Sequence, residues 1–224
     1  MTEREWGHLW LSEGFATYFA ALWTRHARGD AAYRTEMSGI RKEVFADSVV
    51  AVRPVIDVEE TNYLKLLNAN SSQKGGFILY MLHEQLGDSA FFGGLRSYYA
   101  RYRHGTALSD DLRLELERAS GRSLKPFFDQ WLKVPGVAEP SIGWAHDAAT
   151  QQVTLVVIQD GRRGAFALPL AVTVTNASGV TTHTMVSVPA DVRATIALPG
   201  RYALPPRSLA FDPDDRLLAR ITRL

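Results

Sequence analysis

One carboxylate stands in an unusually apolar stretch near the start of the sequence. Glu13 lies within EWGHLWLSEGFATYFAALW, residues 5–23, where most of its neighbours are aromatic or aliphatic. A charge in such surroundings is costly unless it is paired, hydrogen-bonded or bound to a metal ion. The sequence has no cysteine, so histidine and carboxylate side chains would have to hold any metal. Glu13 is therefore a candidate metal ligand; its alternative role is that of a carboxylate stabilised at a helix start.

A second set of polar residues, Ser71, Ser72 and Lys74, stands directly before two glycines in the segment SSQKGG. The spacing Ser71-x-x-Lys74 matches the SxxK pattern of serine acyl-transfer enzymes, in which the lysine activates the serine. The segment is expected to begin a helix, and a helix N-terminus favours an oxyanion. No convincing SDN or KTG accompanies it, so the alternative is that a serine caps the helix. Weak ester hydrolysis in a groove beside these residues stays open as a hypothesis.

The six histidines are scattered and do not form an obvious ligand set with Glu13. Two histidines bind zinc from one helix when they stand at positions i and i+4, and no such pair occurs here. His8 lies shortly before Glu13 and could approach it. We expect the other five to be surface or hydrogen-bonded histidines; they are His26, His83, His104, His146 and His183.

Residues 1–136 are expected to be helical. Apolar residues recur at helical spacing in LSEGFATYFAALWTRHARG, and Gly29 is a plausible helix stop. SQKGGFILYMLHEQLG predicts a buried helix that ends at Gly87, and its Gly75 and Gly76 would permit a close approach to another helix. Further helices are expected over 30–47, from 88 onward, 108–121 and 123–136, and a loop with short turns over 49–70.

Residues 137–224 have the pattern of short strands. Apolar and polar residues alternate between turns rich in glycine, asparagine, aspartate and proline. Runs at intervals of ~8–12 residues suggest an antiparallel sandwich or barrel. The change of pattern falls in the segment VPGVAEP, so we predict an α+β protein with two domains, 1–136 and 137–224. The expected strands lie within 151–160, 166–176, 180–188, 193–200 and 208–215.

The composition is that of a globular protein without a strong charge bias. The chain has 224 residues, 46% of them hydrophobic, and a formal net charge of +1 at pH 7. This charge gives no electrostatic reason to expect binding to nucleic acid or to an anionic membrane. No apolar run approaches the ~20 residues that span a bilayer, and the first residues are polar. We therefore expect a soluble protein without a signal peptide, of unknown compartment.

Four segments, in order along the chain, resemble the M1 family of zinc aminopeptidases, the gluzincins. HLWLSEGFATYFA resembles the segment with the family's third zinc ligand, and NANSSQKGGFILYML the segment with its catalytic tyrosine. The helices that follow, ending in FFDQWL before a Pro-Gly pair, and the strand-rich half resemble the end of the catalytic domain and the β-sandwich after it. The resemblance implies a fold of this kind and a parent reaction in which zinc-activated water removes N-terminal residues from peptides.

The resemblance assigns Glu13 to the third zinc ligand. In the family, two histidines of an HExxH motif supply the other ligands, and the glutamate of that motif is the general base. These 224 residues contain no HExxH, and fewer residues precede Glu13 than the family places between that motif and this glutamate. The resemblance therefore implies a truncated M1 protein that binds zinc weakly or not at all.

The position of the family's catalytic tyrosine, two residues before Lys74, is occupied by Ser72. The tyrosine helps to stabilise an oxyanion, and a donor must lie within ~2.7–3.1 Å of that charge. Serine is several ångströms too short to reach it from the same backbone position, so the resemblance implies an impaired peptidase. Its substrate would be a peptide or a small ester. A non-catalytic scaffold or interaction module is the alternative from another class.

Aromatic residues recur along residues 6–23, and their spacing predicts a helix face that is mainly core. In an intact M1 enzyme part of this face would pack on the missing portion. A large exposed apolar patch drives association, so we expect the chain to dimerise or otherwise to cover this surface. The six residues are Trp6, Trp10, Phe15, Tyr18, Phe19 and Trp23.

Overall fold

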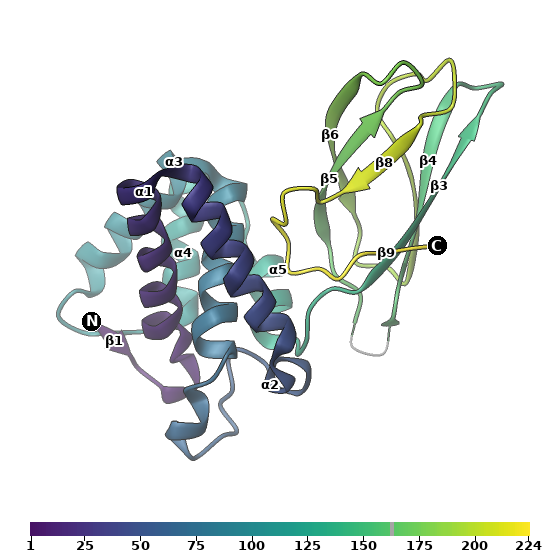
Figure 1. Cartoon of the computed structure of the whole chain (residues 1–224). Helices are drawn as coiled ribbons and strands as arrows, with labels where there is room; N and C mark the ends of the chain where they lie inside the picture. The colour runs from purple at the N-terminus through teal and green to yellow at the C-terminus, as the bar shows by residue number, and fades with distance from the viewer. Residues whose placement is uncertain (162–163) are drawn as a thin grey trace. The chain divides into compact units, whose positions relative to one another are not determined.

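The computed structural model describes residues 1–161 and 164–224 (Figure 1). The described residues fall into two compact units, Met1–Gly136 and Val137–Leu224. Helices dominate the first unit and strands the second, which confirms the predicted α+β class. Each unit has buried apolar residues of its own, among them Phe77 in the first and Leu170 in the second.

Glycines interrupt the two long helices of the first unit. Helix α1 spans Trp10–Ala46, but Gly29 has a φ of 84° and breaks it. Helix α3 spans Gly75–Tyr102, and Gly87, with a φ of 74°, breaks it in the same way. Glycine adopts a positive φ at little steric cost, and such a residue takes the chain out of a helix. Both breaks lie where the sequence predicts a helix to stop.

A chain of hydrogen bonds, buried except at the exposed side chain of Asp88, joins the four helical segments that these breaks create. The hydroxyl of Tyr18, before the break in α1, lies 3.1 Å from the hydroxyl of Tyr33, after that break. The Tyr18 hydroxyl also lies 2.6 Å from Nδ1 of His83, in the first part of α3. Nε2 of His83 lies 2.7 Å from a carboxylate oxygen of Asp88, which follows the break in α3. A side-chain hydrogen bond therefore spans each break.

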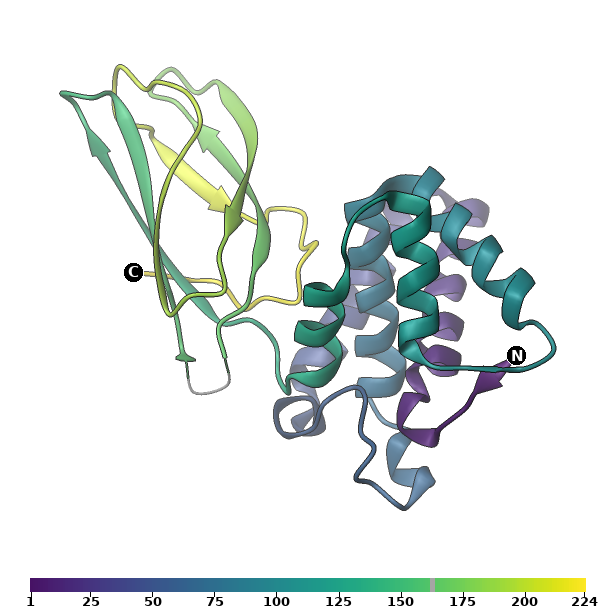
Figure 2. The same ribbon diagram turned by 180° about the vertical axis from the view of Figure 1, so that it is seen from behind.

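The remaining elements of the first unit are short. Helix α4 ends at Gly121, whose φ is 65°, and the view from behind shows α4 alongside α3 (Figure 2). These elements are α2 (Ser48–Val52), α4 (Ser109–Ser120), α5 (Lys125–Phe128), the 3-10 helices Trp6–His8 and Tyr63–Leu66, the π-helical turns Asn70–Lys74 and Asp129–Lys133, and the parallel pair β1 (Thr2–Glu3) and β2 (Thr106–Ala107).

The aromatic residues near the start of the chain divide between the core and the surface. Trp10 and Tyr18 are completely buried, as predicted for a core face. Phe19 and Trp23, which follow Tyr18 on α1, are 46% and 67% exposed, and Trp6 is also exposed. These aromatics therefore do not form one continuous core face.

Two sheets form the second unit. One has the strand order β7-β4-β3-β9 and the other the order β6-β5-β8. Alternate residues along β4 and β5 are buried, as expected when two sheets share an apolar layer. Five strands lie where the sequence predicts them, and β3 and β9 are additional. The strands are β3 (Pro140–Asp147), β4 (Gln152–Gln159), β5 (Leu168–Thr175), β6 (Thr181–Val188), β7 (Arg193–Ala197), β8 (Ser208–Phe211) and β9 (Thr222–Arg223).

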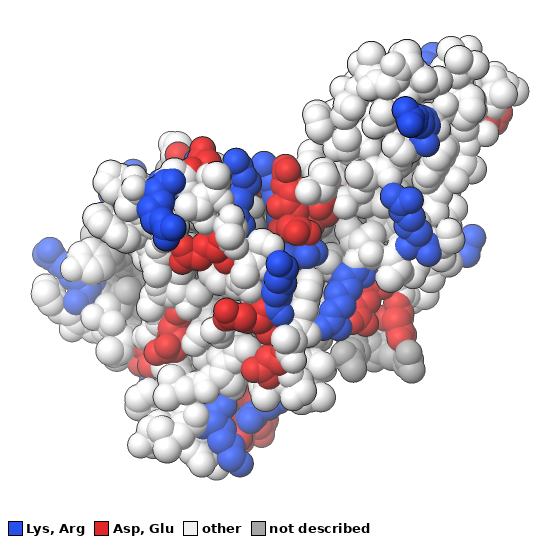
Figure 3. Space-filling model, in the orientation of Figure 1, with Lys and Arg blue, Asp and Glu red and all other residues white. Residues whose placement is uncertain are grey.

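Charged side chains of both signs are interspersed on the visible face, without one large patch of a single sign (Figure 3). This distribution agrees with the formal net charge of +1. Among the helices that the structure describes, none has both the length and the apolar character required to cross a membrane.

Candidate active site

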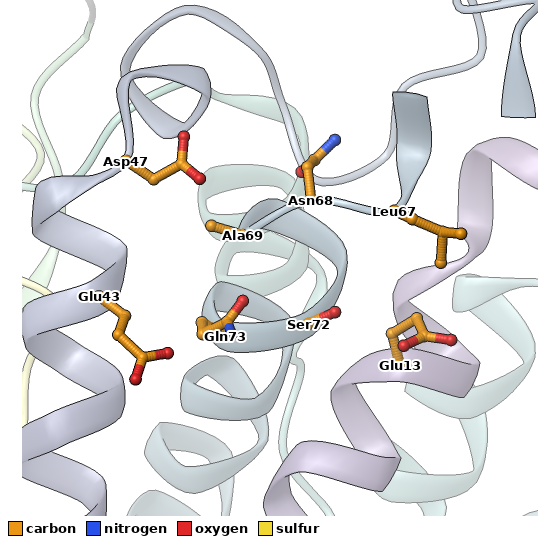
Figure 4. Close-up of a pocket in the computed structure, with 8 residues that line it drawn as sticks. All are labelled: Glu13, Glu43, Asp47, Leu67, Asn68, Ala69, Ser72 and Gln73. Atoms are coloured by element: carbon orange, nitrogen blue, oxygen red, sulfur yellow. The ribbon is translucent and has the colours of Figure 1, made fainter. Parts of the chain in front are cut away.

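A cavity of about 480 Å³ lies between α1 and the turn Asn70–Lys74, which we call the π-turn (Figure 4). Glu13 comes from the first part of α1 and Glu43 from its second part, and Ser72 comes from the π-turn between them. The structure thus brings two of the sequence-predicted site residues, Glu13 and Ser72, to one cavity. The lining residues are Glu13, Glu43, Asp47, Leu67, Asn68, Ala69, Ser72 and Gln73.

Glycines allow α1 and the π-turn to come close enough to share this cavity. A Cβ atom on Gly14 would lie 2.8 Å from the carbonyl carbon of Gly75, and one on Gly76 would lie 2.8 Å from Cγ2 of Thr17. Real Cβ atoms essentially never make contacts this short. The prediction that Gly75 and Gly76 permit a close helix approach is therefore confirmed. Glu13, adjacent to Gly14, is positioned by this crossing.

Hydrogen bonds made by buried groups hold the π-turn in place. Nδ2 of Asn70 donates to the carbonyl oxygen of Arg53 at 3.0 Å and ties the turn to the preceding loop. The N–H of Lys74 donates to the carbonyl oxygen of Ala69 at 2.7 Å, the i-to-i+5 pattern of a π-helix. Single π-helical turns of this kind are rare and are frequent at functional sites. The next helix begins directly at Gly75.

The structure does not pair Ser71 with Lys74. Ser71 is buried, and its hydroxyl donates to the carbonyl oxygen of Leu66 at 2.6 Å. Lys74 is completely buried, and its Nζ has no hydrogen-bond partner among the described residues. Burial lowers the pKa of this amine to about 7. Neither Ser71 nor Ser72 caps helix α3. Of these three predicted residues, only Ser72 lines the cavity.

Carboxylates give the cavity a negative lining. The carboxylates of Glu13 and Glu43 have no hydrogen-bond or ion-pair partner among the residues that the structure describes. Asp47 is engaged at the start of α2, where its side chain accepts a hydrogen bond from the N–H of Val49 at 2.8 Å. Among the residues that the structure describes, no lysine or arginine lines the cavity. This arrangement favours a positively charged group over a negatively charged one.

The described residues do not form a complete zinc site around Glu13. Across ranges 1–161 and 164–224, no group of three histidine, cysteine, aspartate or glutamate side chains is placed to hold a metal ion. Nδ1 of His8 lies 2.8 Å from the hydroxyl of Ser109, so this nitrogen is engaged in a hydrogen bond. Burial also lowers the pKa of His8. A catalytic zinc ion needs three protein ligands, so Glu13 alone does not fit one.

Four polar cavity residues have no role in the sequence-based predictions: Glu43, Asp47, Asn68 and Gln73. Asp47 carries a local signal, since an aspartate before a serine is a common helix N-cap. Glu43 carries none, because it is one of several charged residues on the second part of α1. Only the folding of α1 beside the π-turn brings it to the same cavity as Glu13.

Comparisons with known proteins place these features in a family context. The model of the peptidase family M1 domain matches residues 1–131. Tricorn protease-interacting factor F2 of Thermoplasma acidophilum is 29% identical over 192 residues, which are 80% of this chain and 23% of that protein. Aminopeptidase N of Streptomyces lividans is 29% identical over 143 residues, or 61% of this chain and 17% of that protein.

A solved structure has the same fold. The aminopeptidase A of Legionella pneumophila, in complex with aspartic acid, superimposes with a TM-score of 0.79 at 16% identity. The match covers 99% of this chain and 25% of that chain. This chain therefore spans about a quarter or less of the length of the proteins that it matches.

Proposed function

Because this chain belongs to peptidase family M1, we propose that it forms one wall of an aminopeptidase active site, at which peptides lose N-terminal residues by zinc-dependent hydrolysis. The observation that carries the proposal is the shared cavity of Glu13 and Ser72, which come from segments far apart in sequence. The resemblance assigns these two positions to the family's third zinc ligand and to its catalytic tyrosine. The aminopeptidases among the relatives support the same reaction class.

Glu13 would contribute one ligand to a zinc site whose other ligands lie outside these 224 residues. The sequence contains no HExxH, and the described residues hold no cluster of three potential ligands. We therefore infer that this chain alone retains no stoichiometric zinc. We also infer that Ser72 weakens hydrolysis further, because its hydroxyl cannot take the place of the longer tyrosine side chain.

The contribution of the described residues to substrate binding follows from their charge. The unpaired carboxylates of Glu13 and Glu43 stand on the two sides of the π-turn, and none of the described residues that line the cavity between them is basic (Figure 4). A peptide carries a positive charge at its free amino end and on any lysine or arginine side chain. We infer that the cavity binds such a cationic group of the substrate.

The zinc inference is tested by metal analysis of the purified chain after dialysis against a slight excess of zinc. The expected content is far below one zinc per chain, with no hydrolysis of aminoacyl anilides above the blank. One tightly held zinc per chain that is lost in Glu13→Gln would contradict the inference that outside ligands are needed. An in-frame HExxH in the DNA upstream of Met1 would support it.

The binding inference is tested by calorimetry with arginine amide and with N-acetylnorleucine amide, which carries no charge. Glu43→Gln should weaken arginine amide binding about fivefold, since a solvent-exposed ion pair contributes up to about 1 kcal/mol. Glu36→Gln, on the same helix but outside the cavity lining, is the matched control and should leave the affinity unchanged. Equal affinity for the two amides would refute the inference.

We propose self-association as a second property of this chain, favoured by one observation. Phe15, Phe19 and Trp23 follow one another at helical spacing on α1, and Phe19 and Trp23 are 46% and 67% exposed. Apolar side chains that share an exposed helix face favour contact with another apolar surface. Size-exclusion chromatography with light scattering should show a dimer that Trp23→Ser weakens. A monomer over the whole concentration range would contradict this proposal.

A further inference from the structure

Asn70 carries a buried polar atom that the protein itself does not satisfy. The residue is 2% exposed, and its Oδ1 has no hydrogen-bond partner among the described residues. At least nine in ten buried polar groups in folded proteins have a partner, which is either another protein group or an ordered water. A buried acceptor without any partner destabilises the folded state. The atom therefore points to something that binds there.

The orientation of the Asn70 amide is fixed by its other contact. Nδ2 donates to the carbonyl oxygen of Arg53 at 3.0 Å. Exchanging the nitrogen and the oxygen would set Oδ1 against that carbonyl oxygen, and two acceptors cannot form a hydrogen bond. The unpaired atom is thus an acceptor, and its partner must be a donor.

A small cavity lies against Asn70. Its volume is about 10 Å³, and it is distinct from the 480 Å³ cavity. Such a volume is at the lower limit for a single water molecule and is too small for an organic ligand. The lining combines polar and apolar residues: Gly7, Leu9, Pro54, Val55, Asp57, Leu66, Asn68, Asn70 and Ser71.

The wall of this cavity is formed by segments that cannot easily move inward. Gly7 approaches Asp57 so closely that a Cβ on Gly7 would lie 2.9 Å from the Asp57 carbonyl oxygen. The N–H of Asp57 in turn donates to the carbonyl oxygen of Gly7 at 3.2 Å. Collapse of the wall onto Asn70 is therefore opposed by backbone contacts, and the space persists.

We propose that one internal water molecule occupies this small cavity and donates a hydrogen bond to Oδ1 of Asn70. Asn70 then holds the start of the π-turn through both polar atoms of its amide: Nδ2 bonds to the carbonyl oxygen of Arg53, and Oδ1 bonds to the water. Ser72 and Gln73 follow within the same turn and line the large cavity. Asn70 is thus a positioning residue for the candidate active site. The water site stands whether or not the chain acts on peptides.

The direct test is a high-resolution crystal structure of the chain. It should show one water within hydrogen-bond distance of Asn70 Oδ1 in the wild type and none in Asn70→Leu, which removes the acceptor at similar volume. An empty cavity in the wild type would overturn the proposal, as would a metal cation with short contacts to several oxygens.

A variant that leaves Asn70 unchanged keeps the proposal testable if Asn70→Leu fails to fold. Val55→Ile adds a methylene group to the cavity wall and should expel the water. The unfolding equilibrium constant should then rise about ten- to hundredfold in the wild-type background, because Oδ1 loses its partner. Val44→Ile, at a buried valine of α1 that does not line the small cavity, is the control and should have a clearly smaller effect. Equal effects of the two substitutions would refute the water site.

Hydrogen exchange tests the positioning role separately. In Val55→Ile, the amide hydrogens of Ser72 and Lys74 should exchange several-fold faster than in the wild type, since both belong to the π-turn. The amide of Val157 in strand β4 is the internal control and should not change. Unchanged exchange at Ser72 and Lys74 in a variant that has lost the water would show that Asn70 does not position the turn.

Discussion

Replacement of Gly14 by alanine tests whether the glycine crossing sets the position of Glu13. The new Cβ would lie 2.8 Å from the carbonyl carbon of Gly75, 3.0 Å from its Cα and 3.1 Å from the nitrogen of Gly76. All three atoms belong to the backbone at the start of α3, so no side-chain rotation relieves the contact. An ordinary contact begins at 3.4 Å, and the two segments must separate by several tenths of an ångström.

The expected loss of stability follows from this separation. A gap of 0.5–1 Å forfeits about a quarter to a half of each dispersion contact across an interface. Overpacking of a tight site costs about 1–3 kcal/mol, and we expect the upper part of that range because backbone blocks the new atom. The displacement should also move Glu13 away from Ser72.

The assay is urea unfolding followed by circular dichroism at 222 nm, which reports mainly on the helical unit. The chain offers a matched control in Gly39→Ala, also on α1, where a Cβ would meet nothing within 4 Å. This control should be stabilised by about 0.5–1 kcal/mol, since alanine is the better helix former. If both alanine variants unfold at the same urea concentration, the crossing does not depend on Gly14 and the reasoning fails.

Two further predictions concern buried polar groups. Burial lowers the pKa of Lys74 to about 7, whereas an unfolded lysine titrates near ~10.4. Between these values the unfolded chain binds the proton that the folded chain has released, so this group makes the free energy of unfolding rise with pH. Lys74→Met should therefore be more stable than the wild type at pH 6 by up to a few kcal/mol, with an advantage that shrinks toward pH 10; parallel stability curves would disprove the burial effect. Tyr18→Phe leaves Nδ1 of His83 and the hydroxyl of Tyr33 without their partner and should cost about 1–3 kcal/mol in the same urea assay. Tyr99→Phe, on the exposed side of α3, should change stability by less than about 0.5 kcal/mol, and an equal loss in both variants would show that the buried hydrogen bonds contribute nothing.

Local signals predicted the parts of the fold that depend on single residues. The helix stops at Gly29 and Gly87 follow from a property of glycine alone, its access to positive φ. Strand β3 escaped prediction because Gly143 interrupts its apolar alternation and breaker residues surround it. Its pairing with β4, from Pro140 opposite Gln159 onward, is a tertiary property that no local pattern reveals.

The candidate site was predictable only in part. The resemblance singled out Glu13 and Ser72, which the structure brings to one cavity, and the glycines beside them explain how two helices can meet. The pairing of Ser71 with Lys74 presumes α-helical geometry, in which residues three apart share one face. The π-turn winds more loosely and turns these side chains away from such a shared face. Glu43 could not be identified, because its place in the cavity depends on the path of the whole of α1.

The bond between Tyr18 and Tyr33 has a consequence for the large cavity. Glu13 and Glu43 belong to the two parts of α1 on either side of Gly29, a residue whose backbone alone would serve as a hinge. The hydrogen bond between the two tyrosines holds those two parts together, and the bond from Tyr18 to His83 connects them to α3. The distance between the two carboxylates is therefore determined by hydrogen bonds that neither carboxylate makes. A ligand must therefore fit a cavity of fixed width, because it cannot bring the two carboxylates closer together.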